Sequence, residues 1–153
     1  MEKICGFINK TIATFLGIGF FPAAPGTAAT ALGVGLAFLL KDNLGLYLGF
    51  TLIIFALGVF SSTQVEKLLN RKDPGIIVID EVAGVLIALS GLPLNIPVMI
   101  CGFFLFRAFD MFKIYPINKL EALPGGWGIM LDDVMAGVYT NIVLTIAVKW
   151  SGI

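Results

Sequence analysis

Two adjacent carboxylates interrupt the apolar stretch Ile76-Ile-Val-Ile-Asp80-Glu81-Val-Ala-Gly84. Carboxylates interrupt two further apolar stretches in the same way, Phe103-Phe-Leu-Phe-Arg107-Ala-Phe-Asp110-Met-Phe-Lys113 and Gly128-Ile-Met-Leu-Asp132-Asp133-Val-Met-Ala-Gly137. An unpaired buried carboxylate costs several kcal/mol, and more in lipid, so such residues persist where a metal ion, a cation or water holds them. The three stretches therefore predict a polar site inside an apolar protein.

The overall composition indicates a membrane protein. The chain has 153 residues, about the length of one domain, and is 58% hydrophobic but only 13% charged, with a mean hydropathy of +0.98. In a soluble domain about a quarter of the residues are charged, because the surface must meet water. We therefore predict one membrane-embedded domain over residues 1–153. A soluble all-helical protein with buried helices is the alternative.

Charge and rare residues exclude several classes of function. The formal net charge is zero, whereas binding to a phosphate backbone requires an excess of Lys and Arg, so nucleic acid is not an expected partner. The chain has no histidine, which excludes imidazole metal ligands and His-dependent catalysis. Cys5 and Cys101 are predicted to be two buried thiols. The spacing Cys101-x5-Arg107 matches thiol phosphatases only formally, because Gly-Phe-Phe-Leu-Phe between them is typical of a membrane helix.

Apolar runs separated by Pro, Gly and polar turns predict an all-α, polytopic membrane helix bundle with about four to five spans. The run from Ile4 to Phe21 contains glycines and is followed by Pro22, so we expect an interfacial or re-entrant helix there. The first further helix is expected to follow Pro25-Gly26-Thr27 and to run to residue 40. The others are expected over residues 44–63, 76–92, 96–112 and 133–150. The segment from Lys113 to Trp127 is expected to be a loop.

The distribution of Lys and Arg predicts the orientation. Basic residues precede the first expected span, which ends at residue 40, and occupy the connections around residues 67–72 and 107–119. The other connections contain few basic residues. By the positive-inside rule, the N-terminus and both basic connections are cytoplasmic. The motifs at Thr27, Asp80-Glu81, Arg107 and Asp132-Asp133 then lie at cytoplasmic ends of helices, on one face of the membrane.

Each carboxylate pair has a structural and a functional interpretation. Asp132 and Asp133 follow a glycine-rich turn, and adjacent helical residues point about 100° apart, so both are expected to serve one site only near a helix start. Capping would explain one of the two. Asp80 and Glu81 lie one turn into an apolar helix, too deep for a simple cap, and an ion pair with a nearby Arg or Lys is the structural alternative.

The spacing Arg107-x-x-Asp110-x-x-Lys113 makes successive charged residues neighbours on a helix. A self-neutralising ladder is the structural interpretation. The functional interpretation is that Asp110 helps to hold a metal ion while Arg107 and Lys113 bind phosphate oxygens. Carboxylates without imidazole or thiolate favour Mg²⁺, which usually shares its ligand shell with a substrate phosphate. The predicted chemistry is therefore metal-dependent hydrolysis of a phosphoryl group.

Four motifs occur in the order seen in the phosphatidylglycerophosphatase A family. They are Pro22-x-x-Pro25-Gly26-Thr27, Asp80-Glu81-x-x-Gly84, Phe106-Arg107-x-x-Asp110-x-x-Lys113 and Gly125-Gly126-x-Gly128-Ile129-Met130-x-Asp132-Asp133-x-x-Ala136-Gly137. The chain resembles that family from about Thr14 to Trp150. One departure is Ile114, where the family often has Pro directly after the motif lysine.

The resemblance implies a Mg²⁺-dependent enzyme of the bacterial cytoplasmic membrane that hydrolyses phosphatidylglycerophosphate to phosphatidylglycerol and phosphate, with its site facing the cytoplasm. Its expected partners are this phospholipid and the surrounding membrane lipid. The catalytic residues are then expected to be Asp80, Glu81, Asp110, Asp132 and Asp133. The expected metal ligands are Glu81, Asp110, Asp132 and Asp133, and the expected phosphate-binding residues are Thr27, Arg107 and Lys113. A small cation or proton transporter with a carboxylate-lined site is the alternative function, and it predicts carboxylates near the middle of the bilayer.

Overall fold

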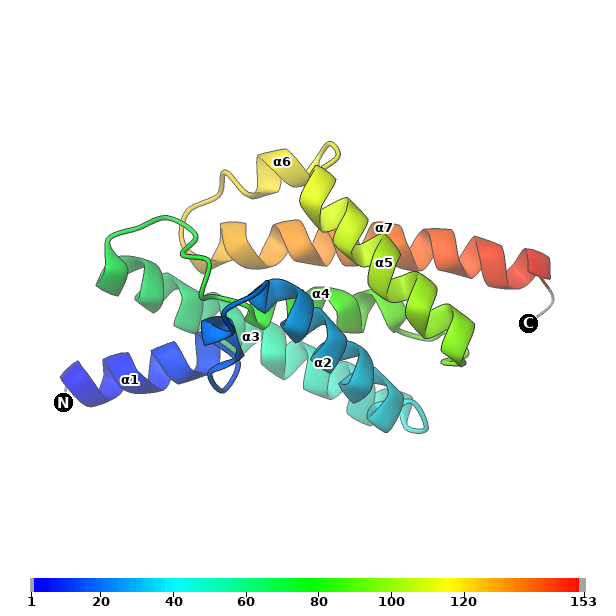
Figure 1. Cartoon of the computed structure of the whole chain (residues 1–153), viewed down its shortest axis with the longest axis horizontal. Coiled ribbons are helices and arrows are strands. Elements are labelled where there is room, and N and C mark those ends of the chain that lie inside the picture. Colours follow the sequence, from blue (N-terminus) through cyan, green and yellow to red (C-terminus); the bar gives the residue numbers. More distant parts are fainter. Residues whose placement is uncertain (1, 152–153) are drawn as a thin grey trace.

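The computed structural model describes residues 2–151 and is built of helices, with no strand in that range (Figure 1). The elements are α1 (Glu2–Ala13), the short 3-10 helix η1 (Ile18–Phe20), α2 (Pro25–Leu40), α3 (Leu44–Leu69), α4 (Ile79–Leu89), α5 (Ile96–Phe112), α6 (Ile117–Leu120) and α7 (Gly126–Ser151). The all-α prediction is therefore confirmed.

Local sequence signals explain where the helices begin and end. Asn43 and Asn95 precede α3 and α5, and each side-chain oxygen accepts a hydrogen bond from a backbone N–H in the first turn, at 3.0 Å. This is the usual way to satisfy a free donor at a helix start. Asn70 and Lys113 end α3 and α5 in the left-handed conformation, which closes a helix by turning the chain away.

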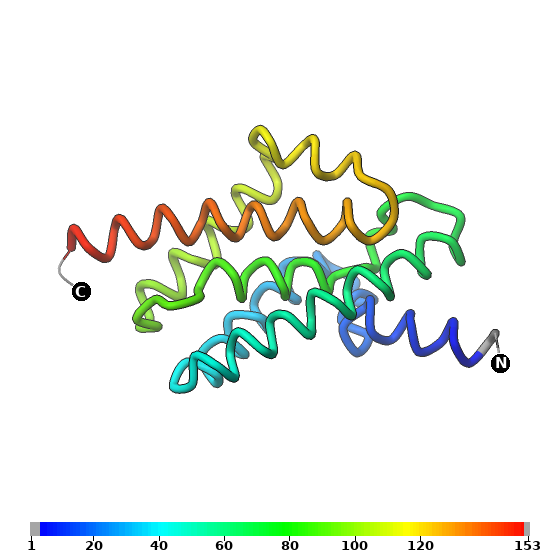
Figure 2. Tube along the Cα trace, turned by 180° about the vertical axis from the view of Figure 1, so that it is seen from behind, coloured from blue at the N-terminus to red at the C-terminus, as the bar shows by residue number. Residues whose placement is uncertain are grey.

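The core of the bundle is α4. All its residues except Glu81 and Ile87 are buried, and it packs against α2, α3, α5 and α7. Seen from behind, α7 and α3 run along it on either side (Figure 2). A helix of this length extends about 16 Å, roughly half of the ~30 Å hydrocarbon core of a bilayer. The helix that we expected over residues 76–92 is thus a short inner helix, which other helices enclose.

Several expected boundaries differ from the structure. The largest difference is at α7, which begins at Gly126 rather than near Asp133. The glycine-rich stretch is its first turn, because a Cβ on Gly126 would overlap the carbonyl oxygen of Val59 in α3. The glycine thus serves close helix packing rather than a loop. The hydroxyl of Thr63 accepts a 2.8 Å hydrogen bond from the Gly126 N–H and fixes this contact.

Smaller differences concern α1, α3, the connection before α7 and the thiols. The N-terminal helix ends at Ala13, and Phe15 and Leu16 then adopt positive φ. Helix α3 continues to Leu69, and the expected loop contains α6. Cys5 and Cys101 are exposed, so the prediction of buried thiols is wrong. Their apolar neighbours form the outer surface of the bundle instead of its core.

Two helices, α3 and α7, are long and apolar enough to cross a membrane. Buried helices of soluble proteins can meet the same criterion, so four to five spans stay a prediction. The outer surface of the bundle is rich in large apolar side chains, as in Leu52 and Ile53 of α3 and Ile142 and Ile146 of α7, each half or more exposed. Soluble monomers rarely expose apolar patches of this extent.

Candidate active site

Helices α4 and α7 cross at two glycines. A Cβ on Gly84 would lie 2.7 Å from the carbonyl oxygen of Asp133, and one on Gly137 would overlap the carbonyl oxygen of Gly84. Close approach of two helix backbones requires small residues at the crossing. Gly84 and Gly137 each follow an acidic residue, Asp80 and Asp133, by four positions, which places each pair on one helix face. The crossing therefore brings the carboxylates of the two helices together.

Three of these carboxylates form a compact acidic cluster, which consists of Asp80, Glu81 and Asp133. One oxygen atom from each residue lies within 4.8 Å of the others. Among the described residues, Asp80 Oδ1, Glu81 Oε2 and Asp133 Oδ2 are buried without a hydrogen-bond partner. Buried carboxylate oxygens without donors are costly, and like charges in contact add to the cost. Their geometry and donor chemistry fit a hard divalent cation.

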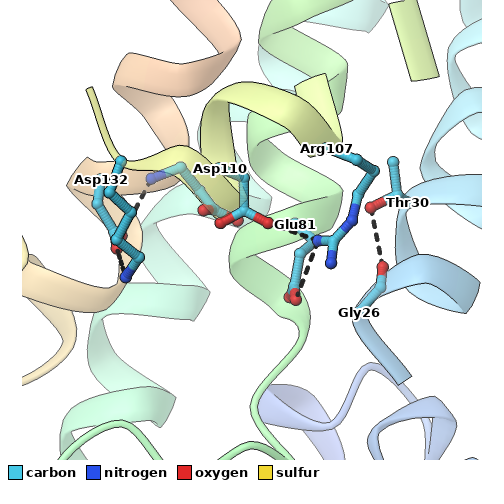
Figure 3. Close-up of polar contacts among 8 residues, drawn as sticks. Gly26, Thr30, Glu81, Arg107, Asp110 and Asp132 are labelled. Atoms are coloured by element: carbon cyan, nitrogen blue, oxygen red, sulfur yellow. Dashed lines mark hydrogen bonds and ion pairs between the residues drawn. The ribbon is translucent and has the colours of Figure 1, made fainter. Parts of the chain in front are cut away.

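Arg107 connects the acidic cluster to the start of α2. Its Nη1 donates to Asp110 Oδ2 at 2.6 Å and lies 3.7 Å from Glu81 Oε1 (Figure 3). The first turn of α2 approaches both side chains because Gly26 has no Cβ, which would overlap Glu81 Oε1 and lie 3.3 Å from Arg107 Nη1. The hydroxyl of Thr30 donates to the Gly26 carbonyl at 2.8 Å. A guanidinium group therefore stands between the acidic cluster and a helix N-terminus.

Lys113 forms a second charged group on the α7 side of the site. Its Nζ donates to Asp132 Oδ2 at 3.1 Å and pairs with Glu121 Oε1 at 2.8 Å. Partial burial lowers the pKa of Lys113, but its hydrogen bonds and attraction to Glu121 and Asp132 outweigh this and raise the pKa above its usual value. The lysine therefore stays charged and ties the segment after α5 to α7.

Asp132 and Asp133 are nearly two turns inside α7, not at its start, and they point to different partners. Asp133 joins Asp80 and Glu81, whereas Asp132 faces Lys113. Asp132 Oδ1 also accepts a 3.0 Å hydrogen bond from the Asp133 N–H. Both side chains are buried. The adjacent aspartates therefore link two parts of one site.

The other predicted residues lie in different parts of the site. Asp80, which the sequence did not assign as a metal ligand, lies in the acidic cluster, while Asp110 is paired with Arg107. Thr27 is exposed on the first turn of α2. Glu121 was missed, because a single acidic residue in a polar connection carries no distinguishing signal. The structure thus collects the predicted charged residues from α4, α5 and α7 at one end of the bundle.

Comparisons with known proteins find one family. The family profile described as phosphatidylglycerophosphatase A matches residues 11–148. A relative in Bacteroides thetaiotaomicron, named a putative phosphatidylinositol-3-phosphatase, is 38% identical over 94% of this chain and 95% of its own. Proteins named phosphatidylglycerophosphatase A in Haemophilus influenzae and Escherichia coli are 37% and 34% identical, over 91% and 87% of this chain and 88% and 79% of theirs.

No solved structure matches the chain. The profile extends over nearly the whole sequence and includes all four motifs, and relatives above one-third identity span most of both chains. The chain therefore belongs to the phosphatidylglycerophosphatase A family.

Proposed function

We propose that this protein removes the terminal phosphate of phosphatidylglycerophosphate, with Mg²⁺ as cofactor, at the cytoplasmic face of a bacterial membrane. Family membership supports the reaction and the lipid class. The observation that carries the metal-dependent chemistry is the acidic cluster, where Asp80, Glu81 and Asp133 have buried oxygens without partners next to Arg107.

In this proposal Asp80, Glu81 and Asp133 hold Mg²⁺, and Asp110 and Asp132 orient the flanking cations. The chemistry that Mg²⁺ supplies when bound is Lewis-acid polarisation of the phosphoryl oxygens. Arg107 exchanges part of its contact with Asp110 and Glu81 for phosphate oxygens, which it binds bidentately. A water oxygen forms the new bond to phosphorus and the bond from phosphorus to the glycerol oxygen breaks. One proton of the water ends on the leaving glycerol oxygen, and the other stays on the released phosphate.

The locations of the charged residues along the helices favour the enzyme over the transporter. Asp80 and Glu81 lie in the first turn of α4, Arg107 in the last turns of α5 and Asp133 nearly two turns into the 26-residue α7. A transporter site is typically near the bilayer midplane, in the middle of its helices. A site at helix ends instead suits a lipid whose phosphate lies at the membrane surface.

The name of the Bacteroides relative supports a second candidate substrate, phosphatidylinositol 3-phosphate. Both lipids carry a phosphomonoester on an alcohol headgroup, so the same cluster could act on either. The two lipids differ in the bulk of the headgroup. The region around Arg107 and the start of α2 would have to accommodate the inositol ring.

Phosphate release by the purified protein in mixed micelles tests the proposal. We expect release from phosphatidylglycerophosphate with Mg²⁺, loss of release in excess EDTA and recovery when Mg²⁺ is restored. Parallel assays with phosphatidylinositol 3-phosphate decide between the two substrates. Full activity in EDTA would exclude the metal, and no release from either lipid would exclude the proposed reaction.

A further inference from the structure

A groove runs between α2 and α5 on the outside of the bundle. It has a volume of about 290 Å³ and is lined by Ala31 and Val34 of α2 and by Ile96, Ile100, Phe103 and Phe104 of α5. No polar side chain lines it within the described part of the chain. Met99 of α5 also lines the groove, and both helices pack directly on α4. A Cβ on Gly33 of α2 would overlap Val85, and one on Gly102 of α5 would lie 2.6 Å from Leu89 Cδ2.

One end of this groove lies towards the active site. On α5, Phe103 and Phe104 precede Arg107 by four and three positions, so the three side chains share a helix face. On α2, Ala31 follows Thr27 by one turn, and the neighbouring Gly26 packs against Glu81 and Arg107. The end of the groove at Ala31, Phe103 and Phe104 is therefore the end nearer to the guanidinium group that would bind phosphate.

The distance along α5 from Arg107 to the far end of the groove matches one leaflet of a bilayer. From Arg107 to Ile96, α5 extends about 16 Å at ~1.5 Å per residue. Half of a hydrocarbon core of about 30 Å is about 15 Å. The outer wall is open, because Ile96, Ile100 and Phe104 are all more than half exposed. A chain could therefore enter sideways from lipid.

A larger apolar cavity of about 520 Å³ does not have this connection. It lies among α1, α2 and α3, and it touches α4 only at Ile79. Ile79 Cγ2 faces Gly58 of α3, and residues two positions apart on a helix point about 200° apart, so Ile79 points away from Glu81. This cavity is thus separated from Arg107 by α4.

We propose that the α2–α5 groove holds an acyl chain of the phospholipid substrate while its phosphate lies at Arg107. The inference rests on the proposed function and adds the position of the lipid's acyl chain. It gives the enzyme a means to distinguish a lipid phosphomonoester from a soluble one, because burying apolar surface in the groove contributes to binding only when a chain is present.

The first test is Ala31→Phe, which fills the groove next to the site, compared with Ala147→Phe, which makes the same change on the exposed surface of α7. With long-chain phosphatidylglycerophosphate, Ala31→Phe should lower kcat/KM by about tenfold or more, the usual effect of altered apolar contacts in a substrate pocket. With an analogue that has very short acyl chains, the two variants should be equal. Equal kcat/KM on the long-chain lipid would overturn the proposal.

A photolabelling experiment with the unmodified protein does not depend on a variant folding correctly. A phosphatidylglycerophosphate analogue with a diazirine halfway along one acyl chain should label peptides containing Ala31, Val34 or Met99. Labelling confined to Phe50 and Leu57, in the larger cavity, would overturn the assignment of the groove. If no lipid phosphate is released by the unmodified protein, the proposed function itself fails, whatever the labelling pattern.

Discussion

At the scale of single residues, the carboxylates of the acidic cluster repel one another. Asp80 and Asp133 are buried with oxygens that have no donor among residues 2–151. Three carboxylates whose oxygens lie within 4.8 Å of one another repel each other strongly in a dry environment. A bound cation would offset this repulsion, so we expect the protein to be less stable without one.

The variant Asp133→Asn distinguishes the effect of this repulsion on stability from the role of Asp133 in catalysis. We expect the variant to raise the thermal midpoint of the protein in EDTA, because one of the like charges is removed. Its activity should fall by about a hundredfold or more, since loss of a metal ligand or positioned charge costs roughly 3 kcal/mol of transition-state stabilisation. Thermal unfolding with and without Mg²⁺, together with phosphate release, measures both effects.

Asp42→Asn is the matched control, because Asp42 is exposed, lies outside the acidic cluster and forms an ion pair with Lys41 at 3.4 Å. This variant should retain both the activity and the stabilisation by Mg²⁺. If Asp133→Asn kept near-normal turnover, Asp133 would have a structural role only.

The sequence predicted which residues are charged and buried, but not how they pair. All five site carboxylates are visible as polar interruptions of apolar runs. That Asp80 and Glu81 face Asp133 depends on the crossing of α4 and α7, which no local pattern specifies. Glu121 could not be recognised, because its partner Lys113 becomes its neighbour only when the segment after α5 folds back.

At the scale of the elements, the position of the site depends on the close contact between α4 and α7. Helix existence was predictable from apolar runs and their Pro, Gly and Asn boundaries. The start of α7 was not, since Gly125-Gly126-x-Gly128 has the composition of a turn. Its glycines allow contact with α3 and with the preceding connection instead: a Cβ on Gly128 would overlap the Leu123 carbonyl oxygen. Only tertiary contact distinguishes these two uses of glycine.

Gly137→Ala tests the helix crossing. The added methyl group would overlap the Gly84 carbonyl oxygen, so α4 and α7 must move apart. We expect a loss of about 1–3 kcal/mol in the free energy of unfolding, typical of overpacking. Activity should also fall, because Asp133 moves away from Asp80.

The control is Gly35→Ala in α2, where an added Cβ has no atom within 4 Å. Alanine favours a helix over glycine by about 1 kcal/mol, so this variant should be as stable as the original protein or more so, and fully active. Denaturant unfolding and phosphate release report on both variants. A fully active and equally stable Gly137→Ala protein would show that α4 and α7 can move apart at the crossing without loss of stability or activity.

At the scale of the whole molecule, the charge distribution predicts a direction in the membrane. The connection before α4 and the connection before α7 lie at the end of the bundle that carries the site (Figure 1). The connection between α2 and α3, which contains Asp42, lies at the other ends of those helices. The proposed topology therefore assigns these connections to opposite sides.

Single cysteines at Lys72, Ala122 and Asp42 test this topology. Cys5 and Cys101 must first be replaced, because both are exposed. In intact cells, an impermeant maleimide should label Asp42→Cys but not Lys72→Cys or Ala122→Cys. The latter two should react once the membrane is opened. The reverse pattern would put the site on the outer face, away from a substrate in the inner leaflet.

The assembly of the site from distant segments has a consequence for its biosynthesis. Gly26, Glu81, Arg107 and Asp133 come from α2, α4, α5 and α7, in the order in which the ribosome makes them. Asp133 completes the acidic cluster, and it lies on the last helix to be synthesised. Under the proposed function, a nascent or truncated chain that lacks α7 has an incomplete cation site, so we expect hydrolysis to begin only after the final helix has emerged and packed against α4.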